Sequence, residues 1–467
     1  MIKEKSKILF IHPPAYTHKK IDAGLKYPPM GIAFLAATAR EAGYPIKIFD
    51  ANVENEPFTK IKKILNEYKP KIVGISFTSL LAESAHEVAG LVKQINKNTV
   101  VIAGGYHPTV KPLEIISDDN FDFVIVGEGE LTFIEWLKNY ETGQKDYSQI
   151  RGLVFKRNQE VIQTSPRELI TNLDVLPFPA YDLLPVNRYS SLASTRKPFI
   201  TFIRSRGCPF YCIFCGVQKM FTRHYRCQSP EKTISEIDKL VKDFQIREIN
   251  FKDSDFLIDK ENVKKLCELL IAKNYDLIWT CNARVDMVNE EILPLMKKAG
   301  CSLITFGVES GSQEILDNLK KGTTIEQIKK AARLVQQFKI KYTFDIILGG
   351  IGESRQTFEQ TLNLLKELSP DYVHLAFLTA FPGSELYDEA IRNNWFLGGK
   401  AEDYNYEELQ INATKISNKE LAKTYQKAFI SFYFRPRYIL KRLKYFTWSE
   451  FKNNLKGLWF IIRSILK

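Results

Sequence analysis

Short apolar runs alternate with amphipathic segments through the first 140 residues of the chain. The amphipathic segments, such as 31–43 and 58–68, carry their apolar residues at helical spacing. The apolar runs are the predicted strands, and they lie at 7–12, 45–50, 71–77, 99–105 and 121–127. Apolar strands joined by helical crossovers are typical of a parallel sheet covered on both faces. We therefore predict an α/β fold that begins with a doubly wound domain of the Rossmann or flavodoxin type, which binds ligands at the carboxyl ends of its strands.

The same alternation resumes after a loop-rich stretch and continues to about residue 380. Residues 151–163 have the pattern of a hairpin, and five prolines follow between 166 and 198. Six further strand-like runs then lie at 199–205, 247–253, 277–282, 302–309, 342–349 and 372–378. Six βα units are too few for a closed eight-fold barrel. The pattern predicts a partial (βα)6 barrel of the TIM type, with its active site at the carboxyl ends of the strands.

These changes of pattern divide the chain into four predicted parts. The parts are a doubly wound domain at 1–145, a hairpin and proline-rich linker at 146–198, the partial barrel at 199–385 and a helical, basic C-terminal extension at 386–467. Residues 421–467 hold eleven Lys and Arg and one acidic residue, so they carry ten of the chain's twelve net positive charges. The net positive charge therefore lies mostly in the C-terminal tail and not on the body of the protein. For this reason we expect no nucleic-acid partner.

Within the tail, apolar residues such as Phe451, Leu455 and Ile462 recur at helical spacing with Lys and Arg among them. Basic amphipathic helices rich in aromatic residues can lie in an anionic membrane surface. The same pattern suits a helical cap on the barrel with its charges in water. Two interpretations stay open at this point: peripheral contact with the inner face of a membrane through 421–467, or a docked cap.

The composition, with 45% hydrophobic and 26% charged residues, is that of a globular protein and excludes a disordered or disulfide-scaffold chain. No apolar run approaches the roughly 18–20 residues of a membrane-spanning helix. The first residues lack the apolar core of a signal peptide, so we expect a cytoplasmic protein with reduced thiols. Three of the seven cysteines lie within eight residues, which favours a metal or redox site over disulfides.

The three clustered cysteines, Cys208, Cys212 and Cys215, have C-x3-C-x2-C spacing directly after the first predicted barrel strand. Three thiolates on one loop can hold three irons of a 4Fe–4S cluster and leave the fourth iron open to a chelating ligand. Two alternatives remain from the spacing alone. One is a structural zinc site with Cys227 or His224 as fourth ligand, and the other is three unligated cysteines.

The cysteine motif resembles the cluster motif of the radical S-adenosylmethionine (SAM) enzymes, and the resemblance extends over most of the chain. It implies that the open iron chelates the amino and carboxylate groups of SAM, and that reduction cleaves SAM to a 5′-deoxyadenosyl radical. Such chemistry implies an anaerobic setting and a reductant such as flavodoxin or ferredoxin. The barrel segments 250–256, 279–286, 307–312, 345–354 and 381–386 resemble the strand-end motifs of this family in the expected order.

The resemblance implies a set of SAM-binding residues at these strand ends. They are Phe214, Asp253, Ser254, Asp255, Arg284, Glu309, Ser310, Gly349 and Gly350. Plain structural roles remain as alternatives for several of them. Asp253 and Asp255 could cap the helix that follows them. Glu309 could be a buried carboxylate paired with Arg284.

The first domain resembles the cobalamin-binding domain fused to one branch of this family, the class B methyltransferases. The implied cobalamin-binding residues are Pro14, Ser76, Thr78, Gly104, Gly105, Tyr106, His107, Gly127, Glu128 and Gly129. The chain lacks the Asp-x-His-x-x-Gly motif of the cobalamin-dependent mutases, so we expect cobalt without a histidine lower ligand. We expect His107 to be a loop or edge residue. A doubly wound sheet can also bind flavin or no ligand at all.

These observations predict a cobalamin-dependent radical SAM enzyme with a 4Fe–4S cluster, SAM and cobalamin as cofactors. The predicted reaction is methylation of an unactivated carbon of a small-molecule or lipid-like substrate. A radical cyclase or rearrangement enzyme without net methyl transfer is the alternative within enzymes. A non-catalytic iron–sulfur carrier or sensor is the alternative from another class, and it would not need the strand-end motifs.

Overall fold

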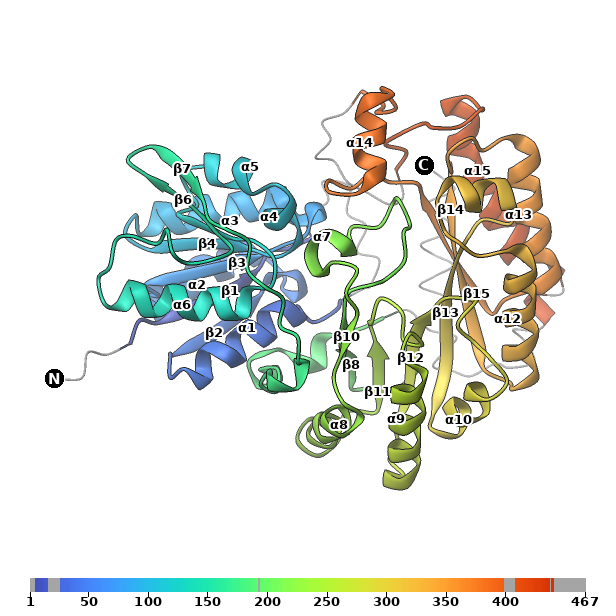
Figure 1. The fold of residues 1–467 in the computed structure, drawn as a ribbon, viewed down its shortest axis with the longest axis horizontal. Coiled ribbons are helices and arrows are strands. Elements are labelled where there is room, and N and C mark those ends of the chain that lie inside the picture. Colours follow the sequence, from blue (N-terminus) through green and yellow to red (C-terminus); the bar gives the residue numbers. More distant parts are fainter. Residues whose placement is uncertain (1–4, 16–25, 192–193, 399–407, 437, 441–467) are drawn as a thin grey trace.

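The computed structural model describes residues 5–15, 26–191, 194–398, 408–436 and 438–440 (Figure 1). Within this part of the chain, two separate parallel sheets are each covered by helices. Figure 1 shows the sheets side by side, with the short helix α7, Val217–Phe221, between them. The two-part α/β architecture predicted above is confirmed.

The N-terminal sheet has seven strands in the order β2-β1-β3-β4-β5-β6-β7. Its strands are β1 Ile8–His12, β2 Ile46–Asp50, β3 Ile72–Ser76, β4 Val100–Gly104, β5 Phe123–Ile125, β6 Leu153–Arg157 and β7 Glu160–Gln163. The first five strands are parallel, in the doubly wound order 2-1-3-4-5. The predicted hairpin, β6 and β7, pairs antiparallel onto β5 and continues this sheet.

Helices cover both faces of the N-terminal sheet. They are α1 Met30–Glu41, α2 Pro57–Tyr68, α3 Ala82–Ile95, α4 Tyr106–Val110, α5 Pro112–Ser117 and α6 Gly129–Glu141. Phe10 of β1 packs with α1 and α6 on one face, whereas Leu9 and Ile11 pack with α2 and α3 on the other. Because successive strand residues point to opposite faces, the apolar run of β1 supplies both cores.

The second sheet is a curved, open barrel of six parallel strands in the order β15-β14-β13-β12-β11-β8. Its strands are β8 Phe199–Phe202, β11 Glu248–Phe251, β12 Ile278–Ala283, β13 Cys301–Glu309, β14 Lys341–Leu348 and β15 Tyr372–Phe377. The helices of this part are α8 Pro230–Phe244, α9 Lys260–Lys273, α10 Ile292–Lys298, α11 Gln313–Asn318, α12 Ile325–Gln337, α13 Arg355–Leu368, α14 Glu385–Arg392 and α15 Asn418–Tyr433. A small antiparallel pair, β9 Ser205–Arg206 and β10 Arg226–Cys227, brackets the segment that carries the clustered cysteines.

The proline-rich segment packs against the barrel through several buried side chains. Leu173, Tyr181 and Tyr189 belong to the hydrophobic core of the barrel. The Tyr181 hydroxyl group donates a hydrogen bond to the Thr201 carbonyl oxygen, 3.0 Å away. The segment therefore covers the edge of the barrel next to β8, and it also connects the two sheets in the chain. In the described residues, no helix has both the length and the apolar composition needed to cross a membrane.

Candidate functional site

The three clustered cysteines lie on the loop between β9 and α7, and each is partly exposed. Backbone contacts fix this loop on two sides. Cys208 N–H donates to the Thr222 carbonyl oxygen at 3.3 Å, and Ile213 N–H donates to the Leu319 carbonyl oxygen at 3.2 Å. At Gly207 the chain has a φ of 89°, and an added Cβ would lie 2.1 Å from a backbone oxygen. Only glycine permits this close approach of the loop to the residues before β10.

The donor set of this loop fits an iron–sulfur cluster. Burial raises the pKa of Cys215 to about 11, so its thiol is protonated at neutral pH until a metal displaces the proton. Among the described residues, no three His, Cys, Asp or Glu side chains converge on a single ion site. A cubane places each thiolate on a different iron, so its ligands need no such convergence. Cys227, the possible fourth zinc ligand, instead accepts a hydrogen bond from Arg204 at 3.1 Å.

A buried ion pair lies at the carboxyl end of β13. Lys321 Nζ is 2.7 Å from Glu309 Oε1, and both side chains are less than a tenth exposed. Burial raises the pKa of the Glu309 carboxyl group, while Lys321 acts in the opposite direction. Glu309 has a φ of 65°, a strained conformation for a residue with a side chain. The alternative that paired Glu309 with Arg284 named the wrong partner, because Lys321 occupies that position.

Arg284 joins three segments around the mouth of the barrel. Its guanidinium group donates to both Asp286 carboxylate oxygens at 3.0 Å and to the Lys321 carbonyl oxygen at 2.9 Å. It also lies 3.6 Å from the centre of the Phe210 ring on the cysteine loop. Arg284 therefore positions the cysteine loop relative to the segment that carries Lys321.

The acidic residues after β11 are held by hydrogen bonds. Asp253 is buried, pairs with Arg204 at 2.8 Å and accepts the N–H groups of Arg204 and Ser205. Asp255 accepts the N–H groups of Leu257 and Arg284, and burial raises the pKa of Asp255 to about 6.

Neither of these aspartates caps α9. Its N-cap is Asp259, whose side chain accepts the N–H group of Asn262, so the capping alternative is wrong. Ser254, between the two aspartates, is exposed.

The remaining predicted SAM-binding residues lie at the ends of β13 and β14 or on the cysteine loop. Ser310 is buried, with its hydroxyl oxygen 3.2 Å from that of Thr361. Gly349 donates its N–H to Glu353 at 2.7 Å, and an added Cβ at Gly350 would lie 2.5 Å from a methyl group. Phe214 packs against the small core around Ile213. Phe214 apart, the predicted SAM-binding residues thus lie just after, or at the ends of, four neighbouring barrel strands.

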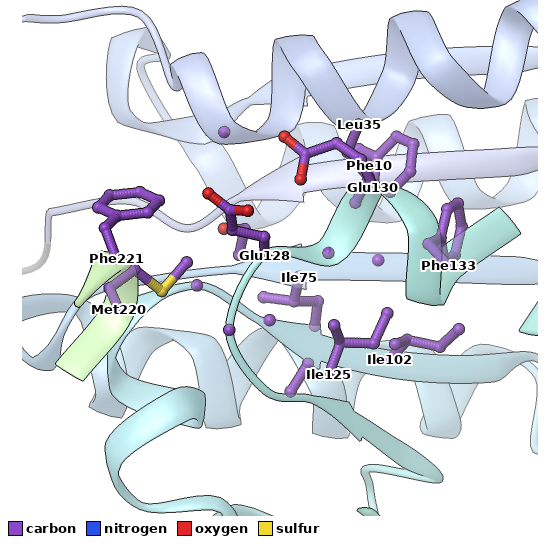
Figure 2. Close-up of a pocket in the computed structure, with 18 of the residues that line it drawn as sticks. Phe10, Leu35, Ile75, Ile102, Ile125, Glu128, Glu130, Phe133, Met220 and Phe221 are labelled. Atoms are coloured by element: carbon purple, nitrogen blue, oxygen red, sulfur yellow. The ribbon is translucent and has the colours of Figure 1, made fainter. Parts of the chain in front are cut away.

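A cavity opens at the carboxyl ends of the N-terminal strands (Figure 2). Six of the predicted cobalamin-binding residues line it, namely Ser76, Gly104, Gly105, Gly127, Glu128 and Gly129. An added Cβ at Gly104 or Gly127 would meet nothing within 4 Å, so these glycines leave room for a ligand. Figure 2 shows Met220 and Phe221 on the opposite side of the cavity. Both belong to α7, so the helix that follows the cysteine loop lines one side of the cavity.

The other four predicted cobalamin-binding residues do not line this cavity. Pro14 is buried, and Thr78 is exposed after β3. His107 is buried on α4, with its Nδ1 2.9 Å from the Ser79 hydroxyl oxygen, so the expectation of a loop or edge residue was wrong. The Tyr106 hydroxyl group donates to the Pro382 carbonyl oxygen at 2.7 Å, and its ring packs so closely on Gly216 that an added Cβ there would lie 1.9 Å from the hydroxyl oxygen. Tyr106 therefore connects the N-terminal sheet to the cysteine loop.

Buried ion pairs join the start of α6 to the β9–β10 pair. Glu128 lies 2.9 Å from Arg226 and 3.2 Å from Arg206, and Glu130 lies 2.5 Å from Arg206. Glu128 also accepts the Ile170 N–H at 2.8 Å. The pKa of Glu128 is lowered, because these partners outweigh the effect of burial. Glu128 therefore connects the two parts of the protein in addition to lining the cavity.

Sequence reasoning missed Lys321, Arg206, Met220 and Phe221. Lys321 lies in the run Leu-Lys-Lys-Gly, but nothing local separates it from its exposed neighbour Lys320. For Met220 and Phe221, the available signal was their closeness in sequence to Cys215. This closeness predicts that α7 lies next to the cluster loop, but it does not predict that α7 contacts the N-terminal sheet.

Two family profiles match the chain. The profile described as the Radical SAM superfamily matches residues 202–365, and the B12 binding domain matches residues 20–137. The "uncharacterized methyltransferase PH0819" of Pyrococcus horikoshii is 34% identical over 453 residues, which are 97% of this chain and 98% of the relative. The anaerobic magnesium-protoporphyrin IX monomethyl ester cyclase of Rubrivivax gelatinosus is 29% identical, covering 86% of this chain and 72% of its own length.

Two solved structures share the fold over both sheets. The cobalamin-dependent S-adenosylmethionine radical enzyme OxsB, with aqua-cobalamin and S-adenosylmethionine bound, has a TM-score of 0.75 at 18% identity, covering 97% of this chain and 72% of OxsB. The methyltransferase TsrM from Kitasatospora setae, with cobalamin and a 4Fe–4S cluster bound, has a TM-score of 0.73 at 15% identity, covering 93% and 90%. With the cysteine loop, the glycine-lined cavity and the two profiles in agreement, this chain belongs to the cobalamin-dependent branch of the radical SAM enzymes.

Proposed function

We propose that this enzyme transfers a methyl group to an unactivated carbon of a small-molecule or lipid-like substrate. The observation that carries the proposal is the position of α7. It begins two residues after Cys215, and its Met220 and Phe221 line the glycine-rich cavity of the other sheet. One short segment thus connects the two cofactor sites, as a reaction that uses both requires.

In this proposal, Cys208, Cys212 and Cys215 hold the cluster. When the cofactors are bound, the cluster supplies the electron that cleaves SAM, and cobalamin supplies the methyl group. The chain's own residues position these groups and exclude water. The cysteine loop supports the assignment of the cluster, because it offers three thiols, one for each iron that the protein would hold.

Glu309 and Lys321 are proposed to bind the amino-acid end of SAM. This end is a zwitterion, and the buried pair offers it one acceptor and one donor of opposite charge. On binding, Glu309 would pair with the ammonium group of SAM and Lys321 with its carboxylate group, so both buried charges would stay compensated. Arg284, which donates to the Lys321 carbonyl oxygen, Asp255, which accepts the Arg284 N–H, and Ser310, which follows Glu309, are proposed to position this pair. Gly349 and Gly350 are proposed to let backbone approach the adenine ring.

Ser76, Gly104, Gly105, Gly127 and Gly129 are proposed to contact cobalamin. Small residues at the carboxyl ends of parallel strands suit a bulky ligand, and the Ser76 hydroxyl group can bond its nucleotide tail. His107 makes its hydrogen bond inside the domain, which supports a cobalt centre without this histidine as lower ligand. The proposed electron donor is a small redox protein of the flavodoxin or ferredoxin class, in an anaerobic setting.

The proposal is tested by anaerobic purification with cobalamin, followed by metal analysis and a labelling assay. We expect about four irons per chain and about one cobalt. Incubation with methyl-labelled SAM, reductant and extracts rich in hydrophobic metabolites should then transfer label to carbon. Four irons without cobalt would contradict methyl transfer from cobalamin and leave the radical chemistry standing.

A radical cyclase is the second candidate, because the Rubrivivax relative carries that name. The same labelling assay separates the two. A cyclase would cleave SAM and release a product of the substrate without methyl label. A protein that binds the cluster but never cleaves SAM would instead be an electron carrier or sensor.

A further inference from the structure

Tyr106 belongs to the N-terminal domain, but its side chain contacts the cysteine loop and the barrel. It begins α4, directly after Gly104 and Gly105, which line the cavity. Its hydroxyl group donates to the Pro382 carbonyl oxygen, 2.7 Å away, in the turn that follows β15. Its ring lies against Gly216, where an added Cβ would be 1.9 Å from the hydroxyl oxygen and 2.4 Å from Cζ. Tyr106 therefore lies where three segments of the protein meet.

The glycine that Tyr106 contacts is tied to the proposed cluster ligands. Gly216 directly follows Cys215, whose N–H donates to the Cys212 carbonyl oxygen at 3.2 Å. A displacement of Gly216 would therefore displace Cys215 as well. The backbone of Gly216 has a φ of −86°, which residues with a side chain also adopt. The three atoms nearest to an added Cβ all belong to Tyr106, so this side chain is what requires glycine at position 216.

The helix that carries Tyr106 is fixed to the cavity wall at Thr109. The Thr109 hydroxyl group donates to the Gly105 carbonyl oxygen at 2.7 Å and accepts the Gly127 N–H at 3.0 Å. Its oxygen also lies 3.5 Å from the Met220 sulfur of α7, and Figure 1 shows α4 next to α7. Gly105, Gly127 and Met220 all line the cavity. The cavity wall therefore fixes the position of Tyr106.

We propose that Tyr106 is a positioning residue for the iron–sulfur cluster, supplied by the cobalamin-binding domain. It holds Gly216, and with it Cys215, at a distance that the cavity wall sets. An aromatic ring has no internal torsion, so the side chain can move away from Gly216 only by losing its hydrogen bond to Pro382. Groups that bind a cofactor are held in place by the packing of such neighbours. The inference rests on the proposed cluster at the three cysteines, and it differs from the direct cobalamin contact that the sequence predicts for Tyr106.

The main test is a pair of substitutions that meet across the two domains. The full-length protein is reconstituted anaerobically with iron and sulfide, and loss of the cluster to an iron chelator is followed by absorbance. Gly216→Ala should lose its cluster about tenfold faster than the unmodified protein, because the added Cβ collides with the Tyr106 ring. In the Tyr106→Ala background, the same substitution should change the rate by less than about twofold, because the colliding ring is gone.

A milder variant, Tyr106→Phe, keeps the ring and removes only its hydrogen bond to Pro382. It should change the EPR spectrum of the reduced cluster and leave cobalamin affinity within about threefold, since Tyr106 does not line the cavity. The matched control is Tyr181→Phe, which also removes a hydroxyl group that donates to a backbone carbonyl oxygen, at 3.0 Å. It should leave the EPR spectrum unchanged. Thermal unfolding of both variants separates a change at the cluster from a general loss of stability.

Three results would overturn the proposal. They are a cluster in Gly216→Ala as stable as in the unmodified protein, an equal effect of Gly216→Ala with and without Tyr106, and a Tyr106→Phe variant with weakened cobalamin binding and an unchanged cluster. Any of these with about four irons in the unmodified protein removes the positioning role alone. Less than about one iron per chain in the unmodified protein would instead contradict the proposed cluster, and the positioning role with it.

Discussion

The two proposed ligand-binding sheet edges of this protein are built in opposite ways. At the N-terminal sheet, Gly104 and Gly127 open a cavity by lacking side chains, and apolar residues such as Ile75 line its depth. At the barrel, the strand ends are filled with buried charged groups, among them Glu309 and Lys321. A bulky ligand needs empty space, whereas a small zwitterion needs compensating charges. Substitutions that add atoms should therefore impair ligand binding at the N-terminal sheet, whereas substitutions that remove charges should impair the barrel edge.

The largest effect is expected from loss of a cluster ligand. Cys208→Ala should reduce iron content from about four to less than one per chain and abolish SAM cleavage. The comparison variant, Cys227→Ala, changes a cysteine that contacts Arg204 and should keep its iron. Iron analysis and a SAM cleavage assay measure both. Loss of metal from Cys227→Ala alone would revive the structural zinc interpretation.

At the charged edge, Lys321→Met should lower the free energy of unfolding by about 3–5 kcal/mol, because it leaves Glu309 buried without a partner. Adding Glu309→Gln to this variant should restore most of the loss. The control is Lys320→Met, which breaks an exposed pair with Glu385 and should cost less than about 1 kcal/mol. Urea unfolding of the cofactor-free protein measures all three. Equal losses of unfolding free energy in Lys320→Met and Lys321→Met would show that burial of the Glu309–Lys321 pair does not affect stability.

At the glycine edge, Gly104→Ile should weaken cobalamin binding about a hundredfold while it leaves stability nearly unchanged. The added side chain enters the cavity and meets no protein atom at its Cβ. The substitution Gly105→Ala should instead affect stability. Gly105 has a φ of 95°, and an added Cβ would lie 2.8 Å from the Ser76 hydroxyl oxygen, so alanine would be strained there. The substitution should lower stability by about 1–3 kcal/mol. Cobalamin titration and thermal unfolding separate the two effects, and normal cobalamin affinity in Gly104→Ile would move the ligand elsewhere.

The smallest effect is a pH dependence at Glu353, next to Gly349 at the barrel edge. Burial raises the pKa of Glu353 to about 7 from its usual 4.5. Between these values the folded protein binds more protons than the unfolded chain, so stability should fall as the pH rises through this window. The contribution of this residue is about 1–3 kcal/mol between pH 5 and pH 8.

The variant Glu353→Gln tests this dependence, because its amide oxygen can still accept the Gly349 N–H. Its free energy of unfolding should decrease less between pH 5 and pH 8 than that of the unmodified protein. Glu385→Gln, at an exposed carboxylate, serves as control. Parallel pH curves for Glu353→Gln and the unmodified protein would contradict the raised pKa.

Most strands of the two main sheets were predictable because they are short apolar runs bounded by polar or glycine residues, as in β1 and β3; the short pair β9 and β10 was not predicted. The spacing of apolar residues indicates which side chains are buried, and the burial of those side chains determines where these strands form. The long-range partners were not predictable by the same means. The pattern predicted the hairpin of β6 and β7 but not its pairing with β5, which depends on the path of the chain in space. It also named the wrong partner for Glu309, since Lys321 approaches it only through the turn after α11.

The site residues divide in the same way. The cysteine spacing is a local pattern, so the cluster loop could be assigned from sequence. The contact of Met220 and Phe221 with the glycine-lined cavity joins residues more than ninety positions from Gly127. No local rule reports such a contact. The assignment of individual SAM-binding and cobalamin-binding residues stays a prediction until ligands are titrated against the variants above.

The Glu128 network has a consequence for how such enzymes can be recombined. Glu128 lies between β5 and α6 of the N-terminal domain, whereas its partners Arg206 and Arg226 flank the cysteine loop. A chimera that joins the first half of this protein to the second half of a relative without these arginines would leave Glu128 buried and unpaired. Such halves would not be interchangeable. Substrate range would be redesigned more safely by grafting loops at the barrel mouth than by swapping whole halves.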